Sequence, residues 1–144
     1  MGEFKKVIFG IDLNYFSKEA LDFTIEFVRS HNSKLVVIFA HQSIMPIVSA
    51  SLPKSIIKKS IEGFDHSLKE LCEENIPEDI DWEAVVLEGK TVYEKIIEAA
   101  TKLSADLIIL GEHDRHGLDN ILLGHNTEKI VRYAACSVFV YKAN

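Results

Sequence analysis

Five short apolar runs recur along the chain, and three of them are apolar at nearly every position. The runs are KVIFGI (6–11), KLVVIFA (34–40), WEAVVLE (82–88), ADLIILG (105–111) and SVFVYK (137–142). The first, second and fourth runs are rich in Val and Ile and do not alternate between apolar and polar residues. This pattern is typical of strands that are buried on both faces of a parallel sheet. We therefore predict five strands at these positions.

Segments with apolar residues at helical spacing lie between the predicted strands. The four predicted helices span residues 18–28, 53–75, 91–103 and 127–134. Ser17 is a suitable N-cap for the first helix, and Pro53 suits the first position of the second. Strands that alternate with helices predict right-handed crossovers and a mostly parallel sheet in an α/β fold. The length of 144 residues indicates that residues 1–144 form a single domain.

The composition argues against several classes of protein. Hydrophobic residues make up 47% of the chain, which does not fit a disordered protein. The net charge of −6 argues against a nucleic-acid partner, because neutralising phosphates needs clustered Lys and Arg. No stretch approaches the ~20 apolar residues that span a bilayer, so we expect no membrane insertion. Cys72 and Cys136 fit no metal or redox spacing, and together with the absence of a signal peptide they favour a cytoplasmic location.

Candidate binding residues follow the predicted strands. In an open parallel sheet, ligands bind outside the carboxyl ends of the strands, where the strand order reverses. Asp12 follows the first strand, Ala40 ends the second and Gly111 ends the fourth. The carboxylate of Asp12 would either accept hydrogen bonds from a nucleobase or ribose, or cap the turn that follows. The residue alone does not decide between these two roles.

The segment GEHDRHGLDNILLGHNT (111–127) combines glycines with a following helix. Gly111 allows a close approach of the backbone, and Gly124 precedes a helix whose N-terminal amides would favour an anion. We predict that Asn126 or Thr127 caps that helix. The same glycines also serve ordinary turns, and neither GxxxxGK[ST] nor GxGxxG is present.

Four segments carry a resemblance to a known family. They are VIFGIDLNYFSKEAL, VLEGKTVYEKIIEAA, ADLIILG and GLDNILLGHNTEKIVRYAACSVFVY. With these segments the chain resembles a universal stress protein domain over essentially its full length. The resemblance implies a three-layer α/β/α sandwich of the flavodoxin or Rossmann-like type. It also implies a five-stranded parallel sheet in the order 3-2-1-4-5.

The resemblance places an ATP motif after the fourth strand. ATP-binding members of the family carry Gly-x2-Gly-x9-Gly-[Ser/Thr], which falls here on Gly111, Asp114, Gly124 and His125. The first and third positions match. Asp114 adds a negative charge where a glycine would approach the phosphates, and this charge would repel a triphosphate. His125 replaces a hydroxyl donor, and its imidazole can also donate a hydrogen bond.

The resemblance implies a nucleotide site with the base near Asp12 and a small apolar residue, here Ala40. The complete set of predicted nucleotide-binding residues is Asp12, Leu13, Ala40, Gly111, Asp114, Gly124, His125 and Asn126. The implied cofactor is ATP with Mg²⁺, or another adenine nucleotide. The resemblance further implies a homodimer formed through the last strand, around Ser137 to Lys142. That strand is short and apolar, and an exposed sheet edge of this kind favours strand pairing.

The leading hypothesis is a cytoplasmic binding or signalling module of the stress response, and not a dedicated enzyme. One alternative is a nucleotide-free protein that acts through its dimer and surface. Another is a weak ATP hydrolase with Mg²⁺ on the phosphates, in which His113 or His116 activates water. A zinc site at His113, His116 and His125 is a further reading, but surface histidines in a polar loop explain these residues more simply.

Overall fold

Five parallel strands form one sheet in the order β3-β2-β1-β4-β5. The computed structural model describes residues 3–11, 17–42, 54–111 and 125–142, with the backbone alone at 54–61 and 125. The strands are β1 (Lys6–Ile11), β2 (Lys34–Gln42), β3 (Trp82–Gly89), β4 (Leu107–Gly111) and β5 (Ser137–Tyr141). The predicted number, direction and order of the strands are confirmed.

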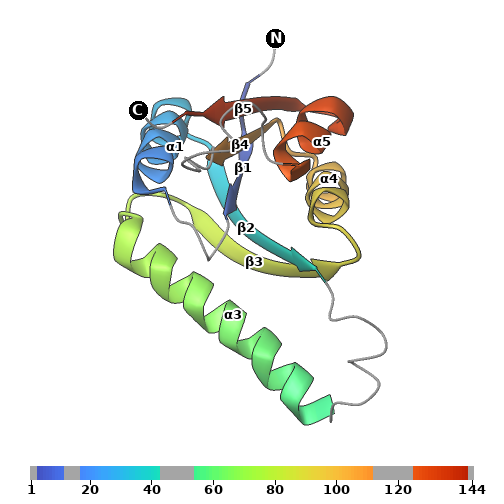
Figure 1. Cartoon of the computed structure of the whole chain (residues 1–144). Helices are drawn as coiled ribbons and strands as arrows, with labels where there is room; N and C mark the ends of the chain where they lie inside the picture. The colour runs from blue at the N-terminus through green and yellow to red at the C-terminus, as the bar shows by residue number, and fades with distance from the viewer. Residues whose placement is uncertain (1–2, 12–16, 43–53, 112–124, 143–144) are drawn as a thin grey trace.

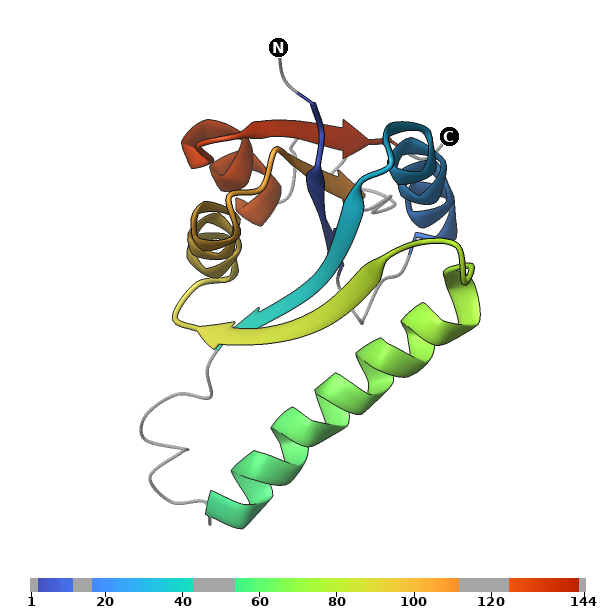
Figure 2. The same ribbon diagram turned by 180° about the vertical axis from the view of Figure 1, so that it is seen from behind.

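In the described part of the chain, four helices cover the two faces of the sheet. They are α1 (Lys18–His31), α3 (Lys54–Asn75), α4 (Val92–Leu103) and α5 (His125–Tyr133). Helices α1 and α3 lie on one face, and α4 and α5 lie on the other (Figure 1). Seen from behind, α3 runs beside β3 at the edge of the sheet (Figure 2). The predicted three-layer α/β/α sandwich is therefore confirmed. Among the described helices, none has the length and apolar character needed to cross a membrane.

The central strands are apolar along nearly all of their length because each face has its own core. Val7 and Phe9 of β1 belong to the core under α1 and α3. Ile8, between them, belongs to the core under α4 and α5. All three side chains are fully or almost fully buried. Successive residues of a strand point to opposite faces, so a strand between two helical layers needs an unbroken apolar run.

The ends of several elements differ from the predicted ones. Strand β2 continues two residues beyond Ala40, because Gln42 still lies in register with Gly89 of β3. Helix α4 begins at Val92, with Thr91 as its N-cap. Helix α5 begins at His125, which is earlier than predicted. The prediction that Asn126 or Thr127 caps α5 is wrong, since both residues lie inside its first turn.

Candidate functional site

The strand order places β1 and β4 side by side at the centre of the sheet. The chain leaves β1 towards β2 on one side and returns to β4 on the other, so the strand order reverses between these two strands. Gly10 of β1 lies in register with Leu110 of β4, one residue before each strand ends. Crevices at such reversal points are the usual ligand sites of open parallel sheets. The candidate site is therefore the carboxyl edge around Ile11 and Gly111.

Gly111 holds the end of β4 against the start of α1. A Cβ atom at this position would lie 3.2 Å from the Cβ of Ala20 and 3.5 Å from the Cβ of Ser17. Ser17 is the N-cap of α1, and its hydroxyl oxygen accepts a hydrogen bond from the amide of Ala20 at 3.2 Å. The sequence predicted a close approach of backbone at Gly111, and the structure shows that helix α1 is the neighbour that requires it.

Ala40 lies near the end of β2, on the face covered by α4 and α5. It is buried, with 6% of its surface exposed, and lies in register with Leu87 of β3. β2 is next to β1 in the sheet and β4 lies on the other side of β1, so Ala40 and Gly111 flank the end of β1. The predicted contact of Ala40 with a nucleobase stays a prediction.

His41 follows Ala40 and lies among aromatic rings on the opposite face. Its ring centroid is 5.6 Å from that of Phe39 and 4.9 Å from that of Phe64 in α3. Its Nε2 atom is buried and has no hydrogen-bond partner among the described residues. No local pattern in the sequence reveals these contacts, because Phe64 lies in a helix 23 residues further along the chain.

Asn126 makes a contact that the sequence did not indicate. Its side-chain Oδ1 accepts a hydrogen bond from the backbone amide of Tyr93, with an N···O distance of 3.2 Å. Tyr93 lies in the first turn of α4, whose N-cap Thr91 makes no side-chain capping bond. The acceptor that α4 lacks at its own N-cap is therefore supplied by α5. Residues 33 positions apart in the sequence form this contact, so no local pattern could have predicted it.

The two thiols are unsuited to nucleophilic chemistry. Burial raises the pKa of Cys72 to about 12, and Glu73 adds to the shift. Burial also raises the pKa of Cys136. A thiol is reactive mainly as the thiolate, which a raised pKa disfavours. Both side chains pack with the apolar cores: Cys72 belongs to α3 and is fully buried, and Cys136 lies against the core under α4 and α5.

Several predicted residues lie outside the described part of the chain. These are Asp12, Leu13, Asp114 and Gly124, together with His113 and His116, and only the backbone of His125 is described. Of the predicted nucleotide residues, Ala40, Gly111 and Asn126 are described with their surroundings, and all three occur at the carboxyl ends of strands or at the helix start that follows. Within the described ranges, no group of three or more His, Cys, Asp or Glu side chains is arranged to hold a metal ion.

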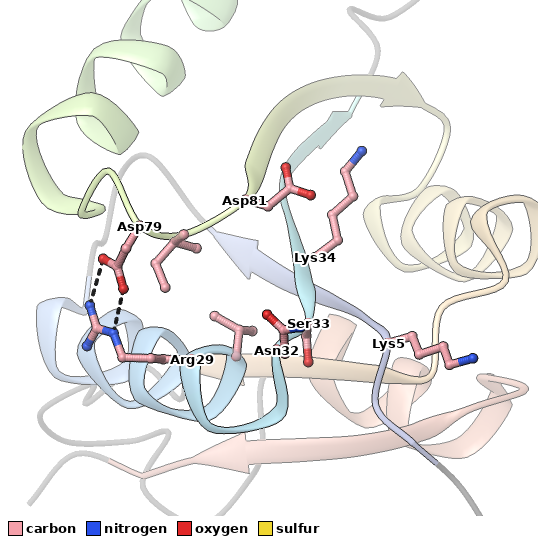
Figure 3. Close-up of a pocket in the computed structure, with 9 residues that line it drawn as sticks. Lys5, Arg29, Asn32, Ser33, Lys34, Asp79 and Asp81 are labelled. Carbon is pink, nitrogen blue, oxygen red and sulfur yellow. Dashed lines mark hydrogen bonds and ion pairs between the residues drawn. The ribbon is translucent and has the colours of Figure 1, made fainter.

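A polar pocket of about 440 Å³ lies at the opposite, amino-terminal edge of the sheet (Figure 3). It lies between the end of α1 and the segment before β3. Arg29 donates two hydrogen bonds to the carboxylate of Asp79, with N···O distances of 2.8 and 3.1 Å. Lys34, at the start of β2, pairs with Glu83 at 3.3 Å. The first ion pair links α1 to the segment before β3, and the second links β2 to β3, so we interpret the pocket as a structural feature of this edge of the sheet.

Comparisons with known proteins agree on one family. The sequence profile of the universal stress protein family matches residues 3–142. The universal stress protein A homolog 1 of Coxiella burnetii is 33% identical over 140 residues, which cover 94% of each chain. Identity at this level over almost the full length indicates common descent and a common fold.

Solved structures show the same architecture. Protein MJ0577 of Methanocaldococcus jannaschii has a TM-score of 0.76 at 18% identity, over 99% of each chain. A universal stress protein in complex with cAMP has a TM-score of 0.69 at 18% identity, over 98% of each chain. The universal stress protein from Archaeoglobus fulgidus in complex with dAMP has a TM-score of 0.60 at 15% identity, over 96% of this chain and 98% of that one.

Proposed function

Because the chain belongs to the universal stress protein family, we propose that it is an adenine-nucleotide-binding module of the stress response and not a dedicated enzyme. The observation that carries the proposal is the reversal of strand order between β1 and β4, with Ala40 and Gly111 on either side of the end of β1. This edge is where open parallel sheets bind nucleotides. Two structurally similar relatives are in complex with cAMP and dAMP, which share an adenine base and a phosphate.

The proposed site has two halves with different chemistry. The base half consists of Asp12, Leu13 and Ala40, and in it the Asp12 carboxylate accepts hydrogen bonds from the base or ribose. The phosphate half consists of Gly111, Asp114, Gly124, His125 and Asn126. The charge of Asp114 repels additional phosphates, and Mg²⁺ carried on ATP offsets part of that repulsion. We therefore expect AMP to bind at least as well as ATP.

The experiment starts with the protein as it is purified. Denaturation followed by mass spectrometry identifies any nucleotide that was bound, and calorimetry then measures AMP and ATP binding to the nucleotide-free protein. Asp12→Ala should weaken AMP binding by about 1–3 kcal/mol, the range for losing a hydrogen bond to a charged group. Asp22→Ala is the matched control, because Asp22 lies on the exposed side of α1 and pairs with Lys18 at 3.2 Å. Equal affinity of the two variants would show that Asp12 does not contact the nucleotide.

A homodimer through β5 is the second part of the proposal. β5 is an edge strand, its sequence SVFVY contains no charged residue, and the side chain of Phe139 is 42% exposed. The other edge strand, β3, carries Glu83 and Glu88, and charges on an edge strand oppose pairing with a second chain. These differences favour pairing of two copies through Ser137 to Lys142. A nucleotide-free protein that acts through this dimer is the alternative function, and in either case we propose a cytoplasmic location.

A further inference from the structure

One side-chain hydrogen bond joins the N-terminal ends of α4 and α5. The Oδ1 atom of Asn126, the second residue of α5, accepts from the amide of Tyr93, the second residue of α4. Amides in the first turn of a helix have no carbonyl partner within the helix. Asn126 therefore provides an acceptor for one of the amides that α4 cannot satisfy by itself.

The side chain of the α4 N-cap residue, Thr91, does not bond to the first-turn amides of this helix. Thr91 has the extended backbone of a normal N-cap, with φ −134° and ψ 143°, yet its hydroxyl makes no capping bond. The Oγ1 atom of Thr91 is buried and has no hydrogen-bond partner among the described residues. At α1, by contrast, the N-cap Ser17 accepts from the amide of Ala20 in the usual way. The start of α4 thus depends on a residue of the neighbouring helix.

The same residue lies where the proposed site would hold phosphate. The first-turn amides of α5 are the groups that an anion at this helix end would contact. The side-chain oxygen of Asn126 is engaged by the Tyr93 amide, and this bond fixes the side-chain amide group while its Nδ2 atom stays a hydrogen-bond donor. Ile96 of α4 and Ile130 of α5 belong to one buried cluster, so the two helices also pack together behind this contact.

We infer that Asn126 is a positioning residue, which holds the first turn of α5 against α4 and so couples nucleotide binding at α5 to the start of α4. The inference rests on the proposed function and adds to it. The sequence indicated that Asn126 contacts the nucleotide, and we add that its Oδ1 atom places α5, the helix whose first turn faces the phosphates. The nucleotide would then stabilise the Asn126–Tyr93 bond although it does not touch Tyr93.

Amide hydrogen exchange at Tyr93, measured by NMR with and without saturating AMP, tests the inference. Without nucleotide, Asn126→Ala should speed Tyr93 exchange roughly 3- to 10-fold, the effect of losing one neutral hydrogen bond. Asn126→Asp keeps the acceptor and should leave the exchange close to that of the wild type. AMP should slow Tyr93 exchange in the wild-type protein, and this slowing should be lost in Asn126→Ala even at saturation.

Asn75→Ala is the control for a general loss of stability. The Asn75 side chain donates a hydrogen bond to the carbonyl of Leu71 at the end of α3, which lies on the opposite face of the sheet from α4 and α5. It should leave both the exchange of Tyr93 and its response to AMP unchanged. If AMP binds but slows Tyr93 equally in wild type and Asn126→Ala, the coupling is overturned and the proposed function stands. If calorimetry shows no AMP binding to the wild type, both are overturned.

Discussion

Gly111 and Ala20 lie so close together that a Cβ atom on Gly111 would be 3.2 Å from the Cβ of Ala20. The first is the last residue of β4, and the second lies in the first turn of α1. This approach fixes where α1 begins relative to the reversal point between β1 and β4. The glycine at position 111 therefore allows α1 to pack against the end of β4, in addition to any contact with a ligand.

Gly111→Ala should destabilise the protein by about 1–3 kcal/mol, the usual cost of an added group in a packed region. Both neighbouring Cβ atoms are attached directly to the backbone of α1, so they cannot move aside by a rotamer change. Gly63→Ala is the control, since a Cβ at this position of α3 would meet no other described residue within 4 Å outside its own helix backbone and chain neighbours. That substitution should stabilise the protein by about 0.5–1 kcal/mol through helix propensity. Urea denaturation measures both, and a Gly111→Ala protein as stable as the wild type would contradict the contact.

The two N-caps should respond differently to alanine. Ser17→Ala removes a hydroxyl that accepts from the amide of Ala20, and it should cost about 0.5–2 kcal/mol of unfolding free energy. Thr91→Ala removes a hydroxyl that makes no capping bond, so its effect should stay within about 0.5 kcal/mol. Thermal or urea unfolding of the two variants compares them directly. A larger loss of unfolding free energy for Thr91→Ala than for Ser17→Ala would show that the Thr91 hydroxyl, and not the Asn126 side chain, accepts the hydrogen bond at the start of α4.

The Arg29–Asp79 pair predicts a pH dependence. Hydrogen bonding and charge from Arg29 lower the pKa of Asp79 below its ordinary value of about 3.9. A carboxyl whose pKa is lower in the folded state stabilises the protein above its unfolded pKa, and this stabilisation is lost as the pH falls through the folded pKa. The difference in unfolding free energy between wild type and Asp79→Asn should therefore be constant at neutral pH and shrink below about pH 4. A difference that persists unchanged at pH 2 would rule out this pair as its source.

The proposed dimer predicts opposite effects at the two edges of the sheet. Phe139→Lys places a charge in the middle of β5 and should convert a dimer into a monomer, because an edge lysine opposes strand pairing. Glu88→Lys introduces the same side chain at the end of β3, on the opposite edge, and should leave the dimer intact. Light scattering coupled to size exclusion gives the mass of each. A wild-type monomer, or a dimer that survives Phe139→Lys, would contradict the proposed interface.

The parts of the fold that were predictable are those that depend on local burial. The nearly continuous apolar runs at 6–11, 34–40 and 105–111 predicted central strands, because residues buried on both faces leave little room for polar positions. The order of the strands came from the family resemblance, since alternation alone does not specify which strands are neighbours. The start of α5 was misplaced, because Asn126 was read as a local cap. Its actual partner, Tyr93, is brought near only by the packing of α4 against α5.

Some features of the candidate site were predictable from the sequence, and others were not. Gly111 was identified from its place at the end of a strand. The close contact with α1 explains why this position holds a glycine. The contacts of His41 with Phe39 and Phe64 were not predictable, because they join a strand end to a helix. Asp12 and Asp114 lie outside the described residues, so their roles at the base and phosphates stay predictions.

Calorimetric titration of the nucleotide-free protein with AMP, and separately with GMP, tests the central claim most directly. The two ligands carry the same ribose and phosphate, so a difference between them reports recognition of the base. We predict saturable heat with AMP and weaker or undetectable heat with GMP. The absence of heat with AMP at millimolar concentration, or equal affinity for both nucleotides, would contradict an adenine-nucleotide site at the carboxyl edge of the sheet.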